Sequence, residues 1–183
     1  MRKALYILGI LDDSDVSWLA QSGKVRSVAP GTDVIRRGVP MDSLFIVIDG
    51  QLLVYSGSVE IARLSAGEIV GEISFVDARP PSASVKAAVA SQVLAVPKSA
   101  LYAKLQKDLG FASRFYRSLA TFLAERLRTA TTRLSSINKA GGEEFGEDLD
   151  ELQTDMLENI ALASLRFDMI IKRLGAHPSG TAS

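Results

Sequence analysis

The sequence has no cysteine and a single histidine among its 183 residues. The absence of cysteine excludes disulfide bonds, thiolate nucleophiles and zinc sites built on cysteine. The histidine, His177, lies in a segment rich in Pro, Gly and Ser, where we expect a tail residue rather than a metal ligand or a general base. The sequence also has no nucleophile–base pair, no metal-ligand cluster and no glycine-rich triphosphate loop. We therefore expect no enzyme and no metal site.

An excess of charge of one sign and a long apolar run are also missing. Lys+Arg and Asp+Glu each number 21, so we expect no general attraction to nucleic acid or to anionic lipid. No apolar run approaches the roughly 20 residues of a membrane-spanning helix. The short run from Ala4 to Leu11 meets Asp12 and Asp13 without a cleavage site, unlike a signal peptide. The expectation is a cytoplasmic protein that binds neither membrane nor DNA.

Short apolar runs and turn residues alternate along the middle of the chain. From Gly23 to about Val96, runs rich in Val, Ile and Leu are separated by turn residues, a pattern typical of a sandwich or barrel. Asp49-Gly50 predicts a tight hairpin between the runs on either side of it, and Ser56-Gly57-Ser58 predicts a second hairpin. We predict an α+β but mainly β fold, built on an antiparallel β-jelly roll of about eight strands.

Helical periodicity flanks this β segment on both sides. Residues 1–22 are predicted to be helical. After the β segment the pattern predicts a short helix, an interruption near Gly110 and a long helix from about Phe111 to Ile137. We expect residues 1–137 to form one domain that includes these helices. Residues 138–183 are expected to hold an acidic linker, a C-terminal amphipathic helix and a flexible tail.

The long helix carries two apolar stripes. Phe115, Leu119 and Phe122 form one stripe, which suits packing on the roll. The second stripe has alternating spacings of four and three residues, as in a heptad seam, and consists of Tyr116, Ala120, Leu123, Leu127, Ala130, Leu134 and Ile137. Two stripes imply two packing partners. We expect a homodimer through the second stripe, with a purely intrachain role as the alternative.

The stretch from Gly67 to Val85 is too irregular for a strand. Its two adjacent prolines, Pro80 and Pro81, lack an N–H group and cannot lie in a central strand. The small residues that follow them would allow backbone N–H groups to approach an anion closely. A ligand-binding loop is one interpretation, and a structured loop that covers the end of the roll is the other.

Two pieces of this stretch carry a family resemblance. Gly71-Glu-Ile-Ser74, followed by Pro81-Ser-Ala-Ser-Val85, resembles the phosphate-binding cassette of the cyclic nucleotide-binding domain family. That family includes bacterial catabolite-activator regulators and the regulatory subunits of cyclic AMP-dependent kinase. We call residues 71–85 the cassette. The resemblance covers roughly Leu8 to Ile137, and it implies cAMP or cGMP as a ligand, with no further cofactor.

The resemblance also implies roles for single residues. Gly71 would let the loop approach the ligand, and Glu72 would accept a hydrogen bond from the ribose 2′-hydroxyl. Ser82 and the amide of Ala83 would meet the cyclic phosphate, and a threonine of the long helix would lie near the base. The candidate binding residues are Gly71, Glu72, Ile73, Ser74, Arg79, Pro81, Ser82, Ala83, Ser84 and Thr131.

One position departs from the family pattern. The family usually places an arginine nine residues after the glutamate, and here that position holds Pro81. A charge-assisted hydrogen bond is worth about 1.5–3 kcal/mol, so its loss weakens binding by about ten- to several-hundred-fold. Three interpretations remain open: Arg79 reaches over from a remodelled loop, the pocket binds another ligand, or the pocket binds none.

These observations favour a regulatory or sensor module that binds a cyclic nucleotide weakly, or a related ligand, and signals through its long helix. The alternative is a ligand-free module that kept the fold and acts on a protein partner. A transcription regulator is disfavoured, because the residues after the long helix are acidic at first and hold no second helix with a basic recognition face.

Overall fold

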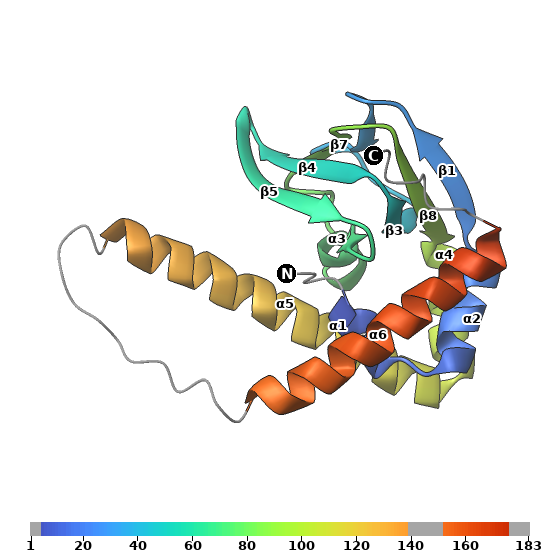
Figure 1. Cartoon of the computed structure of the whole chain (residues 1–183). Helices are drawn as coiled ribbons and strands as arrows, with labels where there is room; N and C mark the ends of the chain where they lie inside the picture. The colour runs from blue at the N-terminus through green and yellow to red at the C-terminus, as the bar shows by residue number, and fades with distance from the viewer. Residues whose placement is uncertain (1–4, 139–151, 176–183) are drawn as a thin grey trace, which may run out of the picture.

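The computed structural model describes residues 5–138 and 152–175, and its centre is a roll of two four-stranded antiparallel sheets (Figure 1). The first sheet has the order β1 (Lys24–Val28), β8 (Ser91–Pro97), β3 (Ser43–Asp49) and β6 (Ile69–Val70). The second has the order β2 (Asp33–Ile35), β7 (Ser84–Ala87), β4 (Gln51–Ser56) and β5 (Val59–Ser65). The predicted jelly roll is confirmed.

Strand β3 contributes side chains to two buried clusters, one inside the roll and one beneath the helices. Phe45 and Val47 point into the roll, where they pack with Leu52 of the opposite sheet. Leu44 and Ile46 belong to a second buried cluster, which the helices form on the outer face of the first sheet. Because both faces of β3 are covered, its sequence is an unbroken apolar run rather than an alternating one.

The hairpin predicted at Asp49-Gly50 is wrong. Strand β3 ends at Asp49 in the first sheet, and β4 begins at Gln51 in the second, so Gly50 turns a corner between the sheets. Gly50 has φ +90°, and a Cβ there would lie 2.7 Å from Cα of Ser91. The Asp-Gly pair indicated the positive φ, but a hairpin and a corner share that requirement. The second predicted hairpin is confirmed, since β4 and β5 pair up to Ser56 and Val59.

Six helices lie in the described part of the chain, and all six contribute buried side chains to the cluster on the outer face of the first sheet. They are α1 (Leu5–Ile10), α2 (Asp13–Ser22), α3 (Glu72–Val76), α4 (Lys98–Lys107), α5 (Leu109–Asn138) and α6 (Leu152–Leu174). Helix α3 is also part of the cassette, and its Phe75 belongs to this cluster. The interruption expected near Gly110 falls at Asp108, whose carboxylate accepts the Phe111 amide at 2.8 Å. Asp108 thus caps the first turn of α5, and Gly110 lies inside that helix.

The first stripe of α5 is buried, as predicted. Phe115, Leu119 and Phe122 are each at most 3% exposed, and Phe115 stacks on Phe111 with 5.4 Å between ring centroids. Helix α6 crosses α1 and α2 (Figure 1) and buries Ala163 and Ile170 in the same cluster. The helical layer is therefore built from both ends of the chain.

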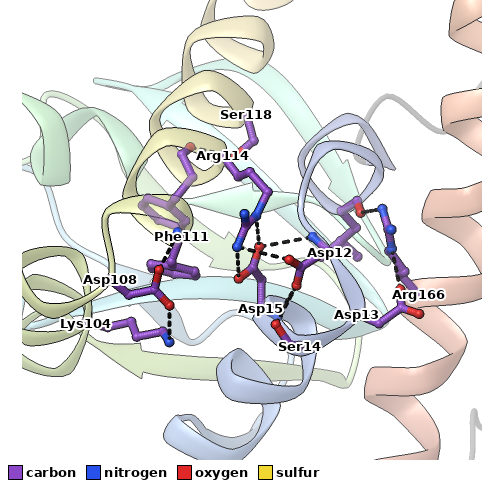
Figure 2. Close-up of polar contacts among 12 residues, drawn as sticks. Asp12, Asp13, Ser14, Asp15, Lys104, Asp108, Phe111, Arg114, Ser118 and Arg166 are labelled. Atoms are coloured by element: carbon purple, nitrogen blue, oxygen red, sulfur yellow. Dashed lines mark hydrogen bonds and ion pairs between the residues drawn. The ribbon is translucent and has the colours of Figure 1, made fainter.

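Ion pairs bind α5 and α6 to the N-terminal helices (Figure 2). Arg114 of α5 donates from Nε to Asp15 at 2.6 Å and from Nη2 to the other Asp15 oxygen at 3.0 Å. It also lies 3.0 Å from Asp12. Arg166 of α6 donates to the carbonyls of Leu8 and Gly9, at 3.1 and 2.9 Å, and pairs with Asp13. These two arginines fix the helical layer.

The described part of the second stripe of α5 is largely uncovered. Tyr116, Ala120 and Leu127 are exposed, and Leu123 is half-buried. Because α6 packs on α1 and α2, it leaves these three side chains uncovered. The side chains of Ala130, Leu134 and Ile137 fall outside the described part, as do the acidic linker and the tail. Over the described ranges, no helix has the length and apolar character needed to cross a bilayer.

Candidate functional site

The cassette begins with a short helix held from two sides. Gly71 has φ +94°, a left-handed conformation that residues with a Cβ rarely adopt, and a Cβ at this position would also displace the end of the Met41 side chain. Helix α3 follows at once. Its last carbonyls are satisfied by α4, because Lys98 Nζ donates to Ser74 at 3.0 Å and the Tyr102 hydroxyl donates to Phe75 at 3.2 Å. Helix α4 thereby fixes the orientation of the cassette helix.

Glu72, the first residue of α3, has a buried carboxylate. Its side chain is 2% exposed, and Oε1 accepts a hydrogen bond from Nη1 of Arg126 on α5. The Arg126 guanidinium also lies over the Phe122 ring, 4.6 Å from its centroid, a favourable cation–π position. Burial raises the pKa of Glu72, and the positive charge of Arg126 lowers it by a smaller amount. A buried carboxylate of the cassette and a partly exposed cation of the long helix therefore form an ion pair.

A cavity of about 70 Å³ lies beside this pair. Most of its walls are apolar, and the residues that line it are Ile35, Val54, Val70, Gly71, Glu72, Ile73, Ser74, Pro81, Ser82, Ala83, Val85 and Arg126. Seven of the ten candidate residues are among them. The folded chain brings both pieces of the cassette to one cavity, next to α5.

The other three candidates lie elsewhere. Ser84 uses its hydroxyl oxygen to accept the Arg37 amide at 3.0 Å. Arg79 is exposed, and its amide donates to the Asp77 carboxylate. Thr131 is exposed as well, and its hydroxyl donates to the Leu127 carbonyl at 3.0 Å. None of the three side chains lines the cavity in the described structure.

Arg126 is the residue that sequence reasoning missed. The signal was present in the first stripe of α5, because Phe115, Leu119 and Phe122 continue at the same spacing to Arg126. A cation that continues a buried apolar stripe requires a buried anionic partner. That partner is Glu72.

The family model described as the cyclic nucleotide-binding domain matches residues 25–108. The match indicates a domain of the cyclic nucleotide-binding type at these residues, which make up a little under half of the chain. The matched segment includes the eight strands apart from the first residue of β1, the whole cassette and helix α4. The predicted resemblance is confirmed. No curated protein matches the chain in sequence.

Solved structures share the fold of this cyclic nucleotide-binding domain. One from Methylobacillus flagellatus has a TM-score of 0.65 and 22% identity, covering 80% of this chain and 85% of that one. The catabolite activator protein of Thermus thermophilus has a TM-score of 0.60 and 21% identity, covering 91% and 83%. PKAR CBD2 bound to Sp-2Cl-cAMPS has a TM-score of 0.53 and 22% identity, covering 76% and 86%. At these identities, the likenesses establish the fold.

Proposed function

We propose that this chain is a regulatory module that binds a cyclic nucleotide, cAMP or cGMP, weakly in the cassette cavity and signals through α5. We further propose that it works in the cytoplasm as a homodimer through the open stripe of α5. The observation that carries the proposal is the ion pair between the buried Glu72 and Arg126, which joins the cassette directly to the long helix. A ligand whose ribose hydroxyl donates a hydrogen bond to Glu72 must change the contact between Glu72 and Arg126.

The donor groups at the cavity fit a sugar phosphate. Glu72 can accept a hydrogen bond from a ribose hydroxyl, and Ser82 and Ala83 face the same cavity from the opposite end of the cassette. The apolar walls, among them Val54 and Val85, suit the flat faces of a base or a sugar. The family match of this segment supports a nucleotide over other sugar phosphates.

Two features make the expected binding weak. Pro81 cannot supply a guanidinium to the phosphate, and the cavity of about 70 Å³ is smaller than the roughly 300–1,000 Å³ of typical ligand pockets. A nucleotide enters only if Arg126 or the cassette moves. The free energy of that movement subtracts from the binding free energy.

The same two features favour the second candidate function, a ligand-free module that acts on a protein partner. In that case the pair of Glu72 and Arg126 is a permanent link between the cassette and α5. Enzyme function is not part of either proposal, and the described residues contain no group of three acidic or histidine side chains that could hold a metal ion.

Calorimetric titration with cAMP and cGMP distinguishes the two functions. We expect saturable binding with a dissociation constant above micromolar for at least one nucleotide. Glu72→Gln should weaken that binding by at least about tenfold, because a charged acceptor is lost. Glu60→Gln, in the hairpin of β4 and β5 and outside the cavity lining, is the matched control and should bind like the wild type. No saturable binding up to millimolar nucleotide would favour the ligand-free module.

A further inference from the structure

Among the described residues that line the cavity, one cation is available to pair with an anionic ligand. Within the described part of the chain, the lining residues include one carboxylate, Glu72, and one cation, Arg126. The cassette position that would hold a cation is Pro81, and the exposed Arg79 lies outside the lining. A positive charge next to a bound ligand therefore comes from α5 rather than from the cassette.

A cyclic monophosphate carries one negative charge. If it entered beside an ionised Glu72 with no cation, two like charges would share a partly desolvated site. The ligand would then bind poorly, or Glu72 would take up a proton. Arg126 removes this conflict if it stays in the cavity when the ligand enters, because one guanidinium can balance one of the two charges and hydrogen-bond to both groups.

The geometry of Arg126 allows this double role. Its one hydrogen bond to a described residue, the bond to Glu72, comes from Nη1, and a guanidinium carries five N–H donors in a planar fork. The side chain is 32% exposed and lies against the Phe122 ring. The ring keeps the plane of the fork in place, while the remaining donors stay available at the mouth of the cavity.

We propose that Arg126 is the phosphate-binding residue of this pocket, supplied by helix α5 in place of the cassette arginine that Pro81 replaces. This inference rests on the proposed function. It assigns the ligand a bridging position, with its ribose on α3 and its phosphate on α5. In this arrangement the ligand acts on the long helix directly, through a charge that the helix itself carries.

Calorimetry with cAMP and with adenosine tests the proposal, because adenosine has the same base and ribose but no phosphate. For Arg126→Gln we expect cAMP affinity to fall by about 10- to 150-fold, the effect of a lost charge-assisted hydrogen bond. Adenosine affinity should change by less than about threefold, within the small range of uncharged effects. Arg128→Gln, on the exposed face of the same helix, is the matched control and should leave both affinities unchanged.

A rescue experiment separates phosphate binding from a structural role. In the double variant Pro81→Arg with Arg126→Gln, the cassette regains a guanidinium, and we expect cAMP affinity to recover to at least the wild-type value. Arg126→Lys keeps the charge beside Glu72 but loses the fork, so its cAMP affinity should lie between those of the wild type and Arg126→Gln. Thermal melts confirm that each variant is folded.

Three results would overturn the inference. Equal or tighter cAMP binding by Arg126→Gln would make Arg126 a competitor of the ligand. Equal losses of cAMP and adenosine affinity would make it a support of Glu72 alone. If neither the wild type nor Pro81→Arg binds cAMP or cGMP, the proposed function fails together with this inference, whereas the first two results leave the proposed function intact.

Discussion

The Arg126 guanidinium of α5 hydrogen-bonds to the buried Glu72 carboxylate of α3, 54 residues away in the sequence. The contact joins the long helix to the cassette beside the cavity that seven of the candidate residues line. Burial raises the pKa of Glu72 despite the adjacent positive charge. The site therefore keeps a carboxylate where an uncharged side chain would cost less desolvation free energy.

Glu72→Gln is expected to change how stability depends on pH. Because the pKa of Glu72 is raised above 4.5 in the folded chain, the folded state holds this proton more tightly than the unfolded state. The contribution of Glu72 to the unfolding free energy therefore falls as pH rises from 4.5 through the folded pKa. The variant should lose this decline and match or exceed wild-type stability at pH 7.

Urea unfolding at pH 4.5, 6 and 7.5 measures the effect of Glu72→Gln, with Glu60→Gln as the exposed control. A variant that is less stable than the wild type at pH 7.5, but equal to it at pH 4.5, would show that Arg126 stabilises the ionised carboxylate by more than burial destabilises it.

Pro81→Arg should raise cyclic AMP affinity by about ten- to several-hundred-fold, because a bidentate guanidinium is added at the cavity. Pro80→Arg is the matched control, since Pro80 is exposed and outside the cavity lining. Calorimetry measures both. Unchanged weak binding by Pro81→Arg would show that the pocket is closed or takes another ligand. Submicromolar binding by the wild type would contradict our interpretation of Pro81.

Arg114→Gln is expected to destabilise the helical layer by about 3 kcal/mol, the typical cost of leaving a buried charge without its partner. Asp15 is 2% exposed and loses both hydrogen bonds from the guanidinium. It keeps one bond from the Asp12 amide, which limits the loss. Arg117→Gln, at an exposed position of the same helix, should change stability by less than about 0.5 kcal/mol. Equal urea midpoints for the two variants would contradict this expectation.

The second stripe of α5 predicts a homodimer. Leu127 is 68% exposed, and an uncovered apolar seam favours a two-fold pair of chains. Leu127→Glu would place two like charges across the pair, at a cost of several kcal/mol, and should yield a folded monomer in light-scattering measurements. Thr121→Glu, which lies off the seam, should stay dimeric. A wild-type chain that sediments as a monomer would contradict the dimer.

The sequence predicted those features that depend on local pattern. The eight strands, the buried stripe of α5 and seven cavity residues follow from periodicity and from the cassette resemblance. The corner at Gly50 was misread because a tight turn does not specify whether its strands share a sheet. Arg126 was missed because its role depends on its contact with Glu72, and the two residues come together only in the folded chain. The position of α6 could not be predicted from local pattern either, because the apolar face of an amphipathic helix does not indicate which surface it packs on.

The contact between α6 and α1 has a consequence for synthesis on the ribosome. Arg166 meets the carbonyls of Leu8 and Gly9 across 158 and 157 residues, and Ile170 completes the cluster that contains Leu8. At roughly 5–20 residues per second, the ribosome needs about 8 to 30 seconds to translate from α1 to α6. During this interval the side of α1 that α6 covers stays exposed on the nascent chain, and the last helix buries it only when its synthesis is complete.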